Sequence, residues 1–209
     1  MTTSILIVYD TIGGNCHAMA KAVASGVESV LGAESIVRRV PKVSRTTEAT
    51  AHPVPSAGAP YVEMSDLQNI DGLILGGPTH FGNFSASLKY FLDSTTSDWL
   101  SGTLTGKPAA VFTSTGSLHG GQEATLLTAH IPLLHHGMVI VGLPYTSAEL
   151  MRTEHGGTPY GASHHSGESG KNPLDNIETS LCQQLGSRVT RVATALSAAN
   201  LAANGTGQN

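Results

Sequence analysis

The sequence predicts an α/β protein built on a doubly wound parallel sheet. Four short, near-continuous apolar runs at residues 4–9, 72–76, 109–114 and 138–143 are typical of parallel strands covered on both faces. Longer stretches with the apolar period of a helix alternate with these runs, which indicates right-handed βαβ crossovers. With a weaker fifth run at 35–40, we expect five parallel strands in the order 2-1-3-4-5, with helices on both faces.

Two of the predicted helices have a clear apolar face. The first follows the first strand, and the second ends the chain. Their apolar positions are Met19, Ala20, Val23, Val27 and Val30 in the first, and Leu181, Leu185, Val189, Val192 and Leu196 in the last. Asp175 followed by Glu178 predicts a capping box at the start of the last helix.

Two segments interrupt the alternation of strands and helices. Residues 41–60 are rich in Thr, Ser, Ala, Pro and His and predict a long surface loop. Residues 145–173 are rich in glycine and predict an excursion after the last strand. Segments of this length in a compact domain are usually functional or oligomeric. We expect one domain over residues 1–201 and a disordered tail over 202–209.

Composition excludes several classes of function. A formal charge of −4 and no basic cluster beyond Arg38 and Arg39 argue against nucleic acid or anionic membrane as a partner. No apolar run approaches the roughly 20 residues needed to span a bilayer. Cys16 and Cys182 stand outside any CxxC, and no signal-peptide pattern precedes them, so we expect a reduced, cytoplasmic protein. The histidines lack an HExxH or CxxC frame, so no metal site is expected.

The loop "DTIGGNC", residues 10–16, joins the first strand to the first helix. Gly13 and Gly14 allow backbone N–H groups to converge, and Asn15 and Cys16 open a helix whose N-terminus favours an anion. These features are typical of a phosphate cradle, although the loop taken alone fits a tight turn with a helix cap equally well. The spacing matches neither a dinucleotide fingerprint nor a P-loop, which leaves a mononucleotide.

Two further glycine-rich loops follow the next strands. In "GGPTHFGNFSASLKYFLD" (76–93), a rigid turn brings the backbone of Thr79, His80 and Phe81 close to any ligand bound there, and Ser85 opens a helix. In "TSTGSLHGGQEATLL" (113–127), three glycines surround small hydroxyl residues before a helix that begins near Gln122. One loop for a phosphate and two beside a flat ring predict a flavin mononucleotide (FMN) site at the carboxyl ends of the strands.

Five motifs together resemble the WrbA-type NAD(P)H:quinone oxidoreductases, a flavodoxin-like FMN family. They are "GGPTHFGNFSASLKYFLD", "WLSGTLTGK" (99–107), "STGSLHGGQEATL" (114–126), "LLHHGMVIVG" (133–142) and "GGTPYGA" (156–162). The resemblance covers residues 4 to about 196 and is weakest over 41–60. It implies a homotetramer that carries one FMN per subunit and passes two electrons from NADH or NADPH to a quinone through the flavin.

The resemblance also implies roles for individual residues. Trp99 matches the aromatic residue that lines the substrate pocket, and His135 matches the flavin-edge histidine, which is the candidate catalytic residue. Both are expected to reach a site shared between subunits, with "GGTPYGA" against a neighbour. The predicted FMN contacts come from the three loops and His135. They are Thr11, Ile12, Gly13, Gly14, Asn15, Cys16, Pro78, Thr79, His80, Phe81, Gly82, Ser114, Thr115, Gly116, Ser117, Leu118, Gly120, Gly121 and His135.

Two other classes of function stay open beside the quinone reductase. One is an electron carrier of the flavodoxin type, and the other is an FMN-binding assembly or regulatory protein with little turnover. Carriers typically present a strongly acidic face, and a charge of −4 spread along the chain argues against that class.

Overall fold

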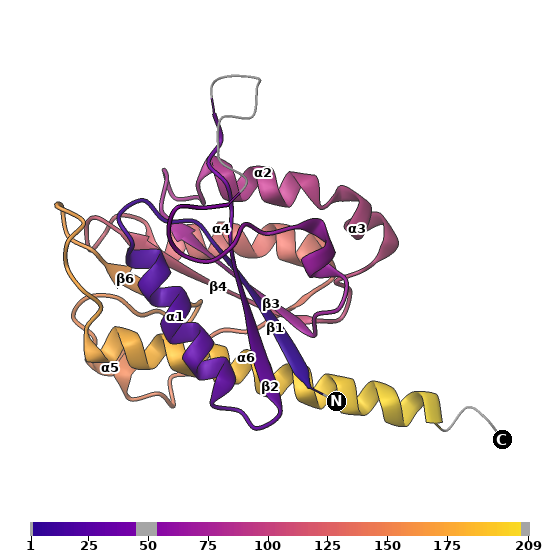
Figure 1. Ribbon diagram of the computed structural model, residues 1–209. Coiled ribbons are helices and arrows are strands. Elements are labelled where there is room, and N and C mark those ends of the chain that lie inside the picture. Colours follow the sequence, from indigo (N-terminus) through magenta and orange to yellow (C-terminus); the bar gives the residue numbers. More distant parts are fainter. Residues whose placement is uncertain (1, 45–53, 206–209) are drawn as a thin grey trace.

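The computed structural model describes residues 2–44 and 54–205, and its centre is a parallel sheet (Figure 1). The main path of the sheet has the order β2-β1-β3-β4-β5, which confirms the predicted order, and a sixth strand also pairs with β4. All pairs are parallel. The strands are β1 (Thr3–Tyr9), β2 (Ala33–Arg39), β3 (Gly72–Pro78), β4 (Pro108–Thr115), β5 (Val139–Ile140) and β6 (Ala162–His165).

Helices cover both faces of the sheet (Figure 1). The helices α1 and α6 lie together on one face, and α2, α3 and α4 lie on the other. The elements are α1 (Asn15–Glu28), the 3-10 turn η1 (Met64–Leu67), α2 (Ala86–Ser94), α3 (Thr96–Ser101), α4 (Gln122–His135), α5 (Glu149–Arg152) and α6 (Asn176–Gly205).

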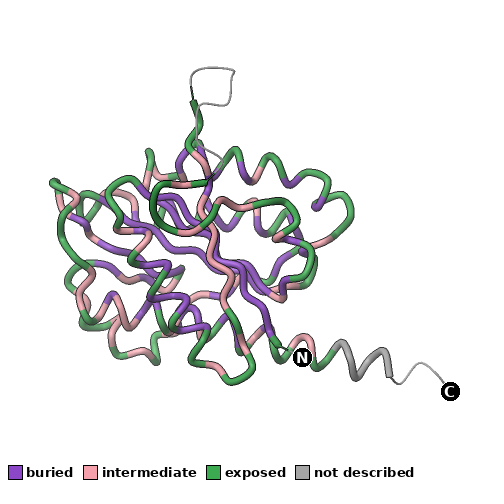
Figure 2. The backbone as a smooth tube through the Cα atoms, in the orientation of Figure 1, coloured by how far each residue is buried: buried purple, intermediate pink, exposed green. Residues whose placement is uncertain are grey.

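The central strands are buried on both sides (Figure 2). In β1, Ile5 and Ile7 belong to the core against α1 and α6, whereas Leu6 and Val8 belong to the core on the opposite face. This double burial explains why the sequence shows continuous apolar runs instead of the alternation of a half-exposed strand.

The outer edge of β4 differs from the prediction. Only Val139 and Ile140 form β5, which pairs with the start of β4, and the chain then leaves the sheet. It returns as β6, which pairs parallel with Phe112–Thr115 at the carboxyl end of β4. The prediction that residues 145–173 follow the last strand is therefore wrong, because this excursion contains β6 and interrupts the sheet edge.

Local signals at helix starts are confirmed. The N–H of Glu178 donates to Asp175 Oδ1 at 2.7 Å, and the N–H of Asp175 donates to Glu178 Oε2 at 3.1 Å, which completes the capping box. Ser85 caps α2, and α4 begins at Gln122. Helix α6 runs to Gly205, into the predicted tail, whereas residues 206–209 and part of the predicted loop at 41–60 lie outside the described residues.

Candidate functional site

A cavity of about 330 Å³ opens at the carboxyl ends of the central strands, where the three glycine-rich loops meet. Residues from all three loops therefore line one cavity. The predicted residues that line the cavity are Thr11, Ile12, Gly13, Asn15, Cys16, Pro78, Thr79, His80, Ser114 and Gly116. A fourth segment, residues 166–170, completes the wall.

The first loop has the geometry of an anion cradle. Gly14 adopts φ 96° as the N-cap of α1, a conformation that favours glycine, and its N–H donates to Thr11 Oγ1 at 3.0 Å. The N–H groups of Ile12, Gly13 and Asn15 have no hydrogen-bond partner among the described residues. Free donors beside the positive end of a helix fit a phosphate without any cation.

Asp10 holds the base of this loop and was missed at the sequence level. Its carboxylate is buried and accepts hydrogen bonds from the N–H of Thr11 at 2.7 Å and from Lys42 Nζ at 2.6 Å. The hydroxyl of Ser85 donates to its other oxygen at 2.6 Å, which ties the first loop to the start of α2. Only its position between a strand and the glycines could have indicated this role.

Cys16 lies at the inner side of the cavity. Burial, with a smaller contribution from the charge of Asp10, raises the pKa of its thiol to about 12. The thiol is therefore protonated at neutral pH, and Cys16 is suited to packing or ligand contact instead of nucleophilic catalysis.

The second loop presents an exposed aromatic ring on a strained backbone. The backbones of His80 and Asn83 exchange hydrogen bonds of 2.7 and 3.1 Å around a turn at Phe81 and Gly82. Phe81 is the one non-glycine residue of the described chain with a positive φ, 54°, and its side chain is fully exposed. Residues in such sparsely populated backbone conformations cluster at active sites and ligand-binding loops.

The third loop lies against the second. A Cβ on Gly121 would stand 3.6 Å from Gly82 Cα, and Thr125 Oγ1 donates to Thr79 Oγ1 at 3.1 Å. Several predicted contacts in these loops are not among the residues that line the cavity. They are Gly14, Phe81, Gly82, Thr115, Ser117, Leu118, Gly120 and Gly121.

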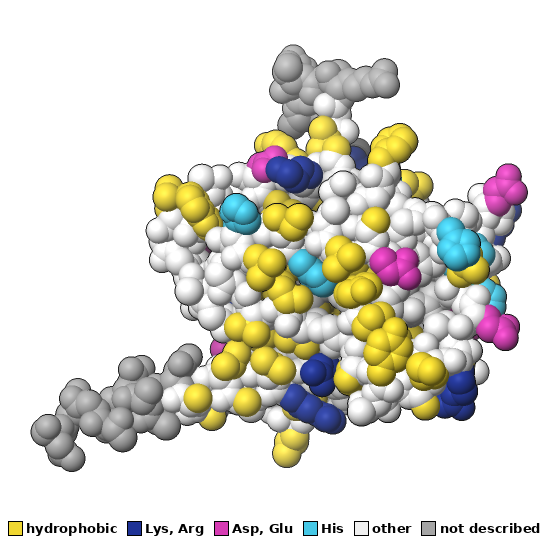
Figure 3. Space-filling model, turned by 180° about the vertical axis from the view of Figure 1, so that it is seen from behind, with side chains coloured by type: hydrophobic (Ala, Val, Ile, Leu, Met, Phe, Trp, Pro, Cys, Tyr) yellow, Lys and Arg dark blue, Asp and Glu magenta, His cyan; other side chains and the backbone are white. Residues whose placement is uncertain are grey.

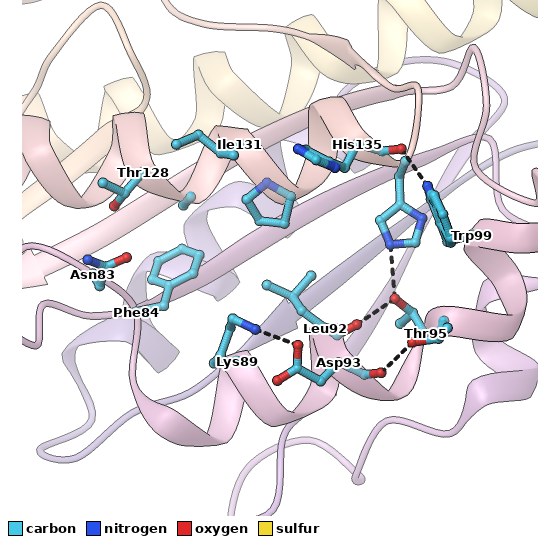
Figure 4. A pocket seen from close by; sticks show the side chains of 14 residues that line it. Asn83, Phe84, Lys89, Leu92, Asp93, Thr95, Trp99, Thr128, Ile131 and His135 are labelled. Atoms are coloured by element: carbon cyan, nitrogen blue, oxygen red, sulfur yellow. Dashed lines mark hydrogen bonds and ion pairs between the residues drawn. The ribbon is translucent and has the colours of Figure 1, made fainter.

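Trp99 and His135 lie in a second pocket of about 680 Å³, between α2, α3 and α4 (Figure 4). The indole N–H of Trp99 donates to the backbone carbonyl of His135 at 2.9 Å. Lys89 and Asp93 of α2 form an ion pair on the opposite wall. No residue lines both pockets, so one chain does not bring Trp99 and His135 to the first cavity.

His136 is fixed in the same pocket by Thr95. Its Nε2 donates to Thr95 Oγ1 at 2.9 Å, because that hydroxyl already donates to the carbonyl of Leu92. Burial lowers the pKa of His136 below the ordinary value, which favours the neutral ring. The sequence assigns a role to His135 and none to His136, and the structure gives His136 the buried, hydrogen-bonded position.

The outer face of α4 is apolar and exposed. Leu127, Ile131 and Leu134 recur at helical spacing and are exposed by 46%, 54% and 58%. Viewed from behind, the molecule carries hydrophobic side chains gathered over its middle (Figure 3). An exposed apolar surface of this kind marks a site of interaction with a protein or ligand.

Two findings concern cofactors and membranes. Within residues 2–44 and 54–205, no three His, Cys, Asp or Glu side chains gather in a way that could hold a metal ion. None of the helices formed by these residues is both long and apolar enough to cross a membrane.

The sheet order and the cradle after β1 define a flavodoxin-like protein. Two solved structures share this fold. A flavodoxin, WrbA-like protein from Agrobacterium tumefaciens matches with a TM-score of 0.65 and 21% identity over 93% of this chain and 99% of that chain. A flavodoxin from the domain Archaea matches with a TM-score of 0.61 and 19% identity over 92% and 99%.

Within this fold, the chain belongs to the NADPH-dependent FMN reductase family, whose model matches residues 3–150. Two relatives carry the name NAD(P)H dehydrogenase (quinone). The protein from Geobacter sulfurreducens is 45% identical over 83% of this chain and 89% of its own length. The protein from Acidithiobacillus ferrooxidans is 44% identical over 82% and 88%. The family resemblance of the sequence motifs is thereby confirmed.

Proposed function

We propose that this chain is an FMN-dependent NAD(P)H:quinone oxidoreductase that carries out the two-electron reduction of quinones. The observation that carries the proposal is the cavity at the strand ends, where the N–H groups of Ile12, Gly13 and Asn15 are free beside the N-terminus of α1. The family match and the names of the relatives support the same activity.

The residues of the cavity fit FMN by their donors and their shape. When bound, FMN supplies a ring that accepts a hydride from NAD(P)H and passes it to the quinone. The loop at residues 11–16 would hold the phosphate, with Asp10 fixing its base. The backbones of Thr79 and Gly116, which line the cavity, would lie against the ring and orient it.

We also infer that the protein works as a homotetramer. Trp99 and His135 lie together but away from the cavity of their own chain, so they would serve the cavity of a neighbouring subunit. The exposed apolar face of α4 supports association. A cytoplasmic location remains a prediction, which the unpaired state of both cysteines supports.

Anaerobic reduction of the FMN-loaded protein tests the proposed function. We expect NADH or NADPH to bleach the flavin absorbance. Benzoquinone, added afterwards, should restore that absorbance at a rate comparable with the rate of bleaching. A protein that binds FMN but is bleached by neither nucleotide would contradict the proposal. Light scattering of the FMN complex at micromolar concentration tests the tetramer, which a monomeric mass would contradict.

A further inference from the structure

Residues 166–170, "SGESG", form the outer wall of the cavity and are tied down at both ends. At one end, the N–H and the hydroxyl of Ser166 both donate to the carbonyl of Thr115, each at 2.8 Å. At the other end, Asn15 Nδ2 donates to the carbonyl of Gly170 at 2.9 Å. The segment therefore bridges from β4 to the phosphate loop, and it closes the side of the cavity that faces α1.

A buried pair supports the segment from behind. His164 is fully buried, and its Nδ1 donates to Glu178 Oε2 at 2.8 Å. Its Nε2 donates to the carbonyl of Asn172 at 3.1 Å, and the N–H of Asn172 donates to the carbonyl of Ser166 at 3.0 Å. Each ring nitrogen of His164 therefore lies within hydrogen-bond distance of an oxygen acceptor. The histidine thus joins α6 to the base of the segment.

The segment also offers unused donors to the cavity. The N–H groups of Gly167, Glu168 and Ser169 have no hydrogen-bond partner among the described residues. Gly167 and Gly170 have φ of 74° and 67°, so the chain turns sharply at both positions. Consecutive free N–H groups in a tight turn are a common backbone arrangement for binding anions.

We propose that residues 166–170 form a strap that binds the phosphate of FMN from beside residues 11–16, and that His164 and Glu178 hold this strap in position. This inference rests on the proposed function, because it assumes that FMN occupies the cavity. It assigns the phosphate a second set of backbone donors, separate from the three loops predicted from the sequence.

Glu168 makes the strap testable without disturbing the core. It is exposed, and it is the one acidic residue among the described residues that line the cavity. A carboxylate beside a phosphate repels it, and salt screens this repulsion. A strap in contact with the phosphate therefore weakens FMN binding through Glu168, while riboflavin, which lacks the phosphate, is indifferent to that charge.

The first experiment titrates apo-protein with FMN and with riboflavin. Glu168→Gln should tighten FMN binding by about two- to fivefold at low salt, with a smaller gain at high salt and no change for riboflavin. The matched control is Glu28→Gln, because Glu28 ends α1 about 20 Å from the N-terminus of that helix. The control should leave both affinities unchanged. An equal change for FMN and riboflavin, or no change for either, would overturn the strap.

The second experiment measures release of FMN after dilution into an excess of a flavin trap. His164→Asn should speed release of FMN about tenfold relative to wild type and leave riboflavin release unchanged, because the strap loses its support. The control is His155→Asn. In the wild type, His155 Nδ1 lies 3.4 Å from Asp175 in a solvent-exposed pair, so the same substitution is made there at a histidine that is not buried.

The two experiments separate the strap from the proposed function. Wild type that fails to bind FMN would overturn the function itself. The strap alone would be overturned if the wild type binds FMN and reduces benzoquinone, while the FMN affinity of Glu168→Gln stays as unchanged as that of Glu28→Gln. If His164→Asn does not fold, as judged by circular dichroism, the Glu168 comparison decides, since that side chain is exposed.

Discussion

Trp99 holds the backbone of His135 and leaves its imidazole free. The indole N–H donates to the carbonyl oxygen of His135 at 2.9 Å, which ties α3 to the last residue of α4. The imidazole makes no hydrogen bond to any residue within the described ranges, and Trp99 is 49% exposed. The hydrogen bond therefore fixes the backbone of His135, while its imidazole is left available to a molecule outside the chain.

If His135 serves the cavity of a neighbouring subunit, as we propose, His135→Ala should slow reoxidation of the reduced flavin by benzoquinone about 100-fold, because it would remove a donor to the developing negative charge on the quinone. FMN content should stay near that of wild type, because His135 does not line the cavity. Stopped-flow absorbance measures the rate. Trp99→Phe keeps the imidazole and should retain most of the turnover. Unchanged reoxidation in His135→Ala would assign the residue to packing.

Phe81 combines a strained backbone with full exposure, and two substitutions separate these properties. Phe81→Ala removes the ring and keeps the left-handed strain, whereas Phe81→Gly removes both. We expect Phe81→Gly to be about 1 kcal/mol more stable than Phe81→Ala in urea unfolding. Both variants should lose flavin affinity to the same extent if the ring contacts the cofactor. Equal stability of the two would contradict the strain.

The fold was predictable because its central strands are buried on both faces. The residues of β1 from Ile5 to Val8 are all 0% exposed. Because side chains on both faces of this strand are buried, the sequence shows a continuous apolar run there. The edge strand β6 was not predictable in this way, because it carries buried polar groups. His164 is bonded to Glu178, and the hydroxyl of Ser163 is bonded to Gln122 at 2.5 Å, so their burial leaves no apolar pattern.

The site was predictable in part for a similar reason. Glycine marks the three loops because their backbone conformations require it, as Gly14 and Gly121 show with φ of 96° and 93°. The contribution of residues 166–170 was missed, although Gly167 and Gly170 also have positive φ. Its defining contact joins Asn15 to Gly170 across 155 positions, and single-sequence patterns carry no information on such pairs.

The buried pair predicts a pH dependence of stability. Burial raises the pKa of Glu178, but hydrogen bonds from His164 and from the N–H groups of Asp175 and His165 outweigh burial, so its pKa lies below the ordinary 4.5. A lowered native pKa adds stability above pH 4.5, and this stability is lost as the pH falls through the native value.

Glu178→Gln should therefore cost about 2 kcal/mol of unfolding free energy at neutral pH, and the difference from wild type should shrink below pH 4.5. Urea unfolding at successive pH values measures it. Glu28→Gln is the control and should stay within about 0.5 kcal/mol of wild type throughout. A difference between Glu178→Gln and wild type that does not vary with pH would argue against a lowered native pKa.

The hydroxyl group of Thr11 can make two hydrogen bonds, one within the loop and one to a bound phosphate. Its Oγ1 accepts the N–H of Gly14 at 3.0 Å, and its own hydroxyl hydrogen remains available to a phosphate. Thr11→Ala should weaken FMN binding about tenfold, because a hydrogen bond to a charged group is lost, and should affect riboflavin much less. Titration of apo-protein with both flavins is the measurement. A parallel loss of affinity for both flavins would mean that the loop does not hold the phosphate.

Cys16 lines the cavity directly after the free N–H of Asn15, but a protonated thiol is a weak hydrogen-bond donor. Cys16→Ser changes one atom and supplies a stronger donor, so we expect FMN to bind about tenfold more tightly while riboflavin is unaffected. Cys182→Ser is the matched control, since Cys182 is equally buried, belongs to the same apolar core and does not line the cavity. It should lower stability without changing the ratio of FMN to riboflavin affinity. If the two serine variants shift that ratio equally, the thiol of Cys16 does not face the phosphate.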